Sequence, residues 1–163
     1  MRNNTKKLTT MAIMVSFALI LSFIESRIPA FVAIPGVKVG LANIAVIFTL
    51  YKMGIKEAAA ISVVRILLVS MLFGNPVSLV YSLAGAALSF SVMLLLKKLT
   101  PLTEVAVSVS GGVMHNIGQI IAASIIMDTN VVAYYLPFLI LSGTIAGIVV
   151  GLITAMLIKR VKI

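Results

Sequence analysis

The stretch VGLANIAVIFTLY, residues 39–51, decides how often this chain crosses a membrane. It is apolar and uncharged, but its 13 residues fall short of the about 20 that a membrane-spanning helix needs. Lys38 and Lys52 flank it, so the span must be extended by snorkelling of these side chains or supported by burial within protein. Counting this stretch as a span determines on which side of the membrane everything after it lies.

The composition around this stretch is that of a protein whose solvent is lipid. Of the 163 residues, 61% are hydrophobic and 10% are charged, and the mean hydropathy is +1.22. A soluble domain of this length has about 25% charged residues. We therefore expect a single transmembrane domain over residues 1–163. The chain has no cysteine, which excludes disulfide and thiolate chemistry.

Six apolar runs predict an all-α membrane protein, a bundle of six transmembrane helices. We expect the first run to be retained rather than removed as a signal peptide, because nothing near Glu25 resembles a small-residue cleavage site. The predicted spans are residues 8–24, 39–54, 55–73, 76–96, 104–127 and 136–158, each bounded to within a few residues.

The basic residues predict how the bundle is oriented. With the N- and C-termini in the cytoplasm, ten basic residues lie on the cytoplasmic side, two (Arg27 and Lys38) lie outside, and Arg65 lies within a span. Omitting the second span would move the basic residues of 159–162 outside. We therefore expect a multi-pass protein of the cell (cytoplasmic) membrane. Because the positive charge is clustered between apolar runs, the net charge of +9 does not indicate a nucleic-acid partner.

The connection between the first two predicted spans differs from the others. It is long, contains Pro29 and Pro35, and ends in a Pro-Gly turn signal, whereas the other connections are short. We expect residues 25–38 to form an outer lid loop, continuing to Gly40, over the bundle. A simple surface connection is the alternative.

Small residues recur at helical spacing on three of the predicted spans. Close backbone contact is what holds helices together in lipid, so these faces indicate packing within the bundle or docking of another membrane subunit. The residues are Gly143, Gly147 and Gly151, followed by Ala155, on the last span; Ser78, Ser82, Gly85 and Ser89 on the fourth; and the weaker pair Ala12 and Ser16 on the first.

Three strong hydrogen-bonding side chains stand in the apolar segment GGVMHNIGQII, residues 111–121. His115 and Gln119 share a helix face with Ser108 and Gly112, and Asn116 lies at the edge of that face. Such a cluster indicates either a ligand site or hydrogen bonds between neighbouring helices. A metal site is disfavoured, because one imidazole without cysteine is a poor ligand set.

Arg65 stands in the middle of an apolar span, where an arginine costs about 2.5–3.5 kcal/mol on insertion scales. The four acidic residues of the chain lie near span ends, although Glu25 could reach inward if the lid folds down. The partner of Arg65 is therefore Glu25, backbone carbonyls, or the carboxylate or phosphate of a ligand. Asn43, one turn into the second span, lies close below the lid.

These residues together predict a polar pocket in the outer half of the bundle, with a void shared by Arg65 and His115. The predicted substrate-binding residues are Glu25, Lys38, Asn43, Arg65, His115, Asn116 and Gln119. No aspartate-rich motif, phosphate-binding loop or activated nucleophile is present in the sequence. We therefore expect a protein that binds a small molecule with an anionic or strongly polar group and that is not an enzyme, with no cofactor and no metal.

The motifs IESRIP (24–29), IPGVKVGLANI (34–44) and HNIGQ (115–119) resemble the heptaprenyl diphosphate synthase component I family, also called the Gx transporter family. That family is similar in turn to the substrate-binding S components of energy-coupling factor (ECF) transporters. The resemblance implies a six-helix protein that binds a vitamin or related small molecule under its first loop. It also implies work with a coupling transmembrane subunit and two cytoplasmic ATPases.

The resemblance assigns roles to individual residues. Glu25 through Gly40 would form the lid, and Asn43 with residues 115–119 would line the pocket. Ala12 and Ser16 are the nearest match to the AxxxA motif by which S components contact the coupling subunit. The alternatives are an accessory subunit in prenyl diphosphate or quinone biosynthesis, which the family's enzyme label implies, and a stand-alone carrier.

Overall fold

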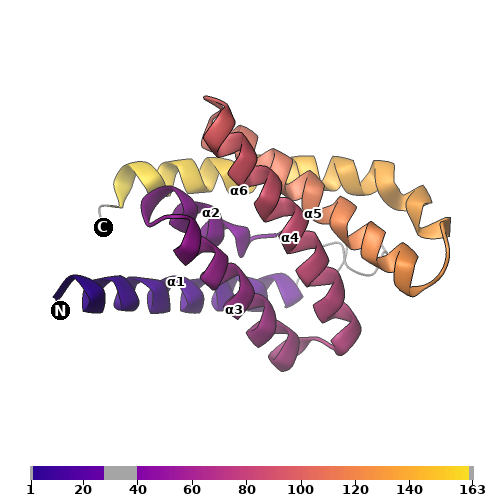
Figure 1. Ribbon diagram of the computed structural model, residues 1–163, viewed down its shortest axis with the longest axis horizontal. Coiled ribbons are helices and arrows are strands. Elements are labelled where there is room, and N and C mark those ends of the chain that lie inside the picture. The colour runs from indigo at the N-terminus through magenta and orange to yellow at the C-terminus, as the bar shows by residue number, and fades with distance from the viewer. Residues whose placement is uncertain (1, 28–39, 162–163) are drawn as a thin grey trace.

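The computed structural model describes residues 2–27 and 40–161, and over these residues it consists of helices and turns without a strand (Figure 1). The elements in chain order are α1 (Arg2–Arg27), α2 (Asn43–Lys52), α3 (Ile55–Phe73), α4 (Pro76–Leu99), α5 (Glu104–Ile126), the short 3₁₀ helix η1 (Val131–Tyr135) and α6 (Leu136–Arg160). The start of α1 and the end of α6 lie at the same end of the molecule (Figure 1).

Four stretches of helix in the described chain are long and apolar enough to cross a membrane. They are Asn4–Arg27, Pro76–Leu99, Glu104–Ile126 and Val131–Arg160. The α3 helix has 19 residues but carries Lys56, Glu57 and Arg65. The structure is thus an all-helical, multi-pass membrane protein. The count of six spans and the cytoplasmic placement of both termini stay predictions.

The helix bounds differ from the predicted spans at two of the helices. The second span was expected over 39–54, but α2 covers only Asn43–Lys52, because the chain at 40–42 forms a turn around Gly40, whose φ is +74°. The first helix is longer than the expected 8–24, because its polar N-terminal residues continue the helix beyond the apolar run. Hydropathy indicates the apolar part of a helix but not the residues at which the helix begins and ends.

The short α2 is supported by protein on all sides. Every residue from Ile44 to Leu50 is buried, and α2 contacts α1, α3 and α6. Figure 1 shows it between α1 and α6. At its C-terminal end, Lys97 Nζ donates to the Leu50 carbonyl oxygen and lies 4.6 Å from the centre of the Tyr51 ring. A helix of ten residues is about 15 Å long, about half the hydrocarbon thickness, and burial makes that length tolerable.

The turn between α3 and α4 is fixed by a capping box. Asn75 Oδ1 accepts a hydrogen bond of 2.7 Å from the Ser78 backbone, and Ser78 Oγ accepts one of 3.0 Å from the Asn75 backbone. Pro76 follows at the first helical position, where its missing N–H is not needed. These contacts hold the first turn of α4 close to the last turn of α3.

Glycines set the distance between α5 and α6. A Cβ atom added at Gly147 would lie 2.5 Å from Val109 Cα, and one at Gly151 would lie 2.7 Å from Val105 Cα. Gly143 meets the Gly112 carbonyl in the same way, at 3.0 Å. The face formed by Gly143, Gly147 and Gly151 therefore packs against α5 inside the molecule.

The α4–α5 contact is equally close. A Cβ atom added at Gly85 would lie 2.8 Å from the His115 carbonyl oxygen, and one at Gly118 would lie 2.8 Å from the Ala84 carbonyl oxygen. On the fourth helix, Gly85 and Ser89 are buried in this contact. These two tight seams make α4, α5 and α6 one continuous unit.

Replacing Gly147 by Ala tests the α5–α6 seam. Because the new methyl group would overlap the α5 backbone, we expect a loss of about 1–3 kcal/mol of stability. The measurement is thermal unfolding of the purified protein in detergent. Ile145→Ala, at a position of α6 that is 56% exposed, is the control and should change the midpoint little. An unchanged midpoint for Gly147→Ala would show that the seam is looser than described.

Candidate functional site

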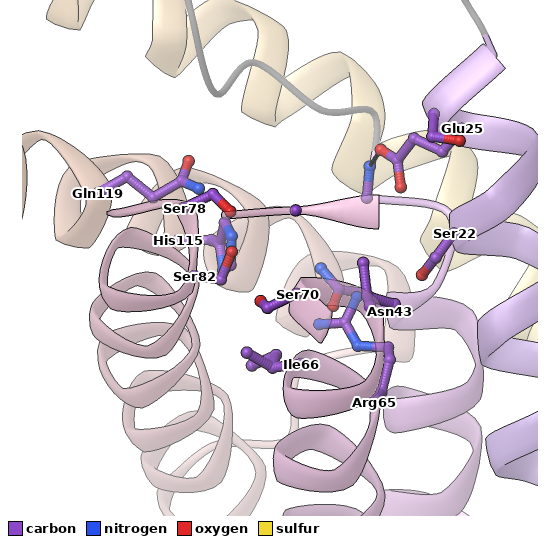
Figure 2. Close-up of a pocket in the computed structure, with 14 residues that line it drawn as sticks. Ser22, Glu25, Asn43, Arg65, Ile66, Ser70, Ser78, Ser82, His115 and Gln119 are labelled. Atoms are coloured by element: carbon purple, nitrogen blue, oxygen red, sulfur yellow. Dashed lines mark hydrogen bonds between the residues drawn. The ribbon is translucent and has the colours of Figure 1, made fainter. Parts of the chain in front are cut away.

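A cavity of about 290 Å³ opens between α1, α3, α4, α5 and the turn before α2 (Figure 2). All five segments contribute the ends that the predicted topology places on the outer side of the membrane. Fourteen residues border it: Ser22, Glu25, Ser26, Gly40, Asn43, Arg65, Ile66, Val69, Ser70, Gly74, Ser78, Ser82, His115 and Gln119.

Arg65 is the cation of the cavity. It projects from the middle of α3, and in Figure 2 its side chain extends toward Asn43. Its Nε atom is buried and has no hydrogen-bond partner among the residues that the structure describes. Glu25 is the acidic residue whose charge acts on the guanidinium. A buried donor without a partner is rare in proteins and indicates a place for a bound water or ligand.

Glu25 ties two segments together at the rim of the cavity. It lies in the last turn of α1, and its Oε1 accepts a hydrogen bond from the backbone N–H of Gly40. The two ends of the predicted lid, Glu25 and Gly40, are therefore held beside the cavity. Most of the predicted lid, residues 28–39, lies outside the described residues, and so does the predicted site residue Lys38.

The opposite wall of the cavity is formed by α5 and α4. His115 and Gln119 are one helical turn apart on α5, and Figure 2 shows them across the cavity from Arg65 and Asn43. Gly85 lets α4 approach them, since a Cβ atom there would lie 3.0 Å from both His115 Cε1 and Gln119 Cγ. Ser82 of α4 borders the same cavity, and Figure 2 draws it on the same side as His115.

Asn116 is placed differently from its neighbours on α5. It is buried in the α5–α6 seam, where its Nδ2 donates a 2.7 Å hydrogen bond to the Leu139 carbonyl oxygen. It does not border the main cavity but a narrower one of about 30 Å³, which Asn43, His115 and Ser108 also line. The Ser108 hydroxyl is buried there without a partner among the described residues. This volume is about that of one water molecule in the liquid.

The structure therefore brings together five of the seven predicted binding residues. Glu25, Asn43, Arg65, His115 and Gln119 border one cavity, and Arg65 and His115 share a void. Their role in binding stays a prediction. The predicted docking pair, Ala12 and Ser16, lies on an exposed face of α1 and away from the cavity.

Serine residues of the cavity were not predicted as site residues. Ser22, Ser26 and Ser70 carried no signal, because single serines are common in apolar helices. Ser78 and Ser82 were interpreted as part of a packing face with Gly85, but they border the cavity. The one available clue was position: Ser22 and Ser26 flank Glu25 on the same face of α1.

The groups around the cavity can bind a polar molecule. One guanidinium, one carboxylate, one imidazole, two amides and five hydroxyl groups surround the space. Among the described residues, no group of three or more histidine, cysteine, aspartate or glutamate side chains is placed to hold a metal ion. The cavity can hold and orient a polar molecule, and Arg65 can pair with a negative group on it.

The sequence was compared with known proteins and families. Neither a curated protein nor a solved structure matches it. One family model, described as heptaprenyl diphosphate synthase component I, matches residues 14–157, which is most of the chain and includes all the described residues of the cavity. This match agrees with the family that the three sequence motifs resemble. The chain belongs to the heptaprenyl diphosphate synthase component I family.

Proposed function

We propose that this protein is the membrane-embedded substrate-capture subunit of a small-molecule importer, similar to the S components of ECF transporters. The supporting observation is the polar cavity around Arg65, enclosed by helices whose composition suits lipid. Polar and charged groups inside a membrane protein are costly and usually mark the path or the site of a polar solute. A site bordered by helix ends on one side of the bundle suits capture from that side.

Energy for transport would come from separate subunits. The sequence contains no phosphate-binding loop and no other nucleotide motif. A coupling transmembrane subunit and cytoplasmic ATPases are therefore the partners in this proposal. The exposed pair Ala12 and Ser16 on α1 supports a docking face, because small residues let another helix approach closely in lipid. Exposed Leu8 and Ile20 extend that face along the helix.

A second candidate function is supported by the family description and by an apolar groove. The groove, about 210 Å³, lies between α1, α2 and α6. All its lining residues are apolar: Ile13, Met14, Phe17, Ile44, Ala45, Phe48, Leu157 and Val161. Lys159 and Arg160 in the last turn of α6 are close in sequence to its end. An isoprenoid chain with a diphosphate group fits this combination, as an accessory subunit in prenyl diphosphate synthesis would require.

The two functions differ in what accompanies the protein. An importer subunit should copurify, under mild extraction, with a transmembrane partner and ATPases. An accessory subunit should copurify with a soluble prenyl diphosphate synthase and should change the activity of that enzyme. Isolation of the tagged full chain from its native membrane, followed by mass spectrometry of the bound proteins, separates these outcomes.

Replacing Arg65 tests the cavity as the binding site. We expect Arg65→Met to weaken retention of the bound small molecule by about tenfold or more, because a charge-assisted hydrogen bond is lost. The measurement is native mass spectrometry of gently purified protein, with its thermal midpoint recorded in parallel. Lys56→Met, which removes a positive charge from an exposed position of the same helix, is the control and should retain the molecule.

Two results would contradict this role for Arg65. One is equal retention of the molecule by Arg65→Met and by the unchanged protein. The other is failure of both Arg65→Met and the charge-conserving Arg65→Lys to insert and fold, which would assign Arg65 to the structure of the bundle rather than to its ligand.

Reconstitution tests the need for an energy source. The purified chain in liposomes should bind the molecule that it retains but should not accumulate it, since it has no nucleotide site of its own. Accumulation should require the coupling subunit, the ATPases and ATP. Flux through liposomes that contain this chain alone would identify a stand-alone carrier instead. Ser16→Leu should lower ATP-dependent uptake without changing binding, because it enlarges a small residue on the proposed docking face.

A further inference from the structure

The lining of the main cavity is more polar than that of most ligand pockets. Of its fourteen residues, ten have polar side chains, two are glycines, and only Ile66 and Val69 are apolar. Ligand pockets are usually lined by hydrophobic and aromatic side chains with a few polar groups among them. Among the residues that the structure describes, no phenylalanine or tyrosine borders this cavity. The described walls therefore offer no phenylalanine or tyrosine ring on which a planar ring system would stack, and only two apolar side chains against which an apolar chain would pack.

Three of the five serines have hydroxyl groups without a hydrogen-bond partner among the residues that the structure describes. Ser26 Oγ donates to the Phe23 carbonyl, and Ser78 Oγ belongs to the capping box of α4. The hydroxyl groups of Ser22, Ser70 and Ser82 make no such bond within the described part of the chain. Elsewhere in the helices, Ser91 and Ser110 bond to the carbonyl four residues earlier. Hydroxyl groups both donate and accept, so they match hydroxyl or amino groups of a solute.

The positions of these groups indicate a ligand with two chemically different parts. Arg65 and Asn43 lie on one side of the cavity, and Ser82, His115 and Gln119 lie on the other (Figure 2). The guanidinium, with its buried and unpartnered Nε, suits a carboxylate or phosphate group. The opposite side offers a hydroxyl, an imidazole and an amide for the uncharged polar part of the same molecule. At about 290 Å³, the cavity is near the lower end of the range of about 300–1,000 Å³ for ligand pockets.

We propose that this cavity binds a small, hydroxylated, non-aromatic organic anion, with its carboxylate or phosphate at Arg65 and its hydroxyl groups on the serine side. The proposal rests on the cavity being the substrate site of the proposed importer. It sets the substrate class apart from flavin-like ring systems, which need stacking surfaces, and from isoprenoids, which need an apolar wall.

A panel of matched probes tests the class. The full chain is purified in detergent, and its thermal midpoint is measured with glycerate, glycerol 3-phosphate, glycerol, benzoate or geranyl diphosphate at equal concentrations. We expect stabilisation by glycerate or glycerol 3-phosphate, because a ligand that binds only the folded state raises its stability. Glycerol lacks the anion, benzoate lacks the hydroxyl groups, and geranyl diphosphate carries an apolar chain, so these three should have no comparable effect.

Variants of residues that line the cavity then test whether the stabilising anion binds there. Arg65→Met should weaken binding of the stabilising anion by about tenfold or more. The double variant Ser70→Ala, Ser82→Ala should weaken glycerate about three- to tenfold more than it weakens propionate, which is an anion without hydroxyl groups. Ser91→Ala, on an exposed position of α4, is the matched control and should change neither. The thermal midpoint without ligand shows whether each variant is folded.

Several results would overturn the proposed class. One is stabilisation by benzoate or geranyl diphosphate that equals or exceeds that by the hydroxylated anions and that Arg65→Met abolishes. Others are no stabilisation by either hydroxylated anion, and loss of propionate binding as large as that of glycerate in the serine variant. An aromatic or isoprenoid mass that native mass spectrometry finds retained by the unchanged protein and lost from Arg65→Met would overturn it as well.

These outcomes are independent of the importer proposal. Binding is measured on the isolated chain, so absence of ATP-dependent uptake would remove the importer role and leave the ligand class standing. Conversely, ATP-dependent uptake of an aromatic or uncharged compound would support the importer role and refute the ligand class.

Discussion

A guanidinium in the middle of a helix surrounded by apolar sequence is the constraint on which the site depends. Arg65 cannot be solvated by lipid, so the surrounding residues must provide polar contacts or room for water and ligand. Arg65 borders a cavity at which ten of the fourteen lining residues have polar side chains, and Glu25 is the acidic residue whose charge acts on the guanidinium. The serines, amides and imidazole around Arg65 belong to helices whose other residues are mostly apolar.

The tight glycine seams explain where this cavity can exist. At Gly85, Gly118 and Gly147 the helices α4, α5 and α6 approach until no Cβ atom would fit between them. The cavity opens on the side of this unit that faces α1 and α3. Those two helices are joined at their other end, where Lys7 of α1 forms an ion pair with Glu57 of α3. The helices α4, α5 and α6 pack closely where glycines lie between them. The polar space lies where serines line the neighbouring helices.

The sequence predicted the helical elements well and the local geometry less well. Long apolar runs gave α3, α5 and α6 within about two residues, because lipid demands continuous apolar helix. The length of α2 was overestimated, since hydropathy cannot detect the turn at Gly40. Of the predicted binding residues, Glu25, Asn43, Arg65, His115 and Gln119 border one cavity, while their role in binding stays a prediction. Asn116 was placed at the edge of the face of His115 and Gln119, and the sequence could not show that it lies in the α5–α6 seam, because a step of one residue, about 100° around the helix, decides whether an amide faces a cavity or a seam.

The serines show the limit of that reasoning. A serine in an apolar helix usually bonds to its own backbone, as Ser91 does, and only the arrangement of neighbouring helices reveals that Ser70 and Ser82 do not. Ser70 and Ser82 border the cavity because of how the separate helices α3, α4 and α5 pack together. Periodicity within one helix therefore cannot find them.

The ten-residue length of α2 has a consequence for evolution of the site. Asn43, its first residue, and Gly40 just before it border the cavity, so the start of α2 forms part of the cavity wall. One additional helical turn would advance that wall by about 5.4 Å into the space. If the cavity binds the proposed substrate, an insertion or deletion before α2 would change the size of molecule that fits while leaving the polar side chains in place, so size and charge selectivity are set by different parts of the chain.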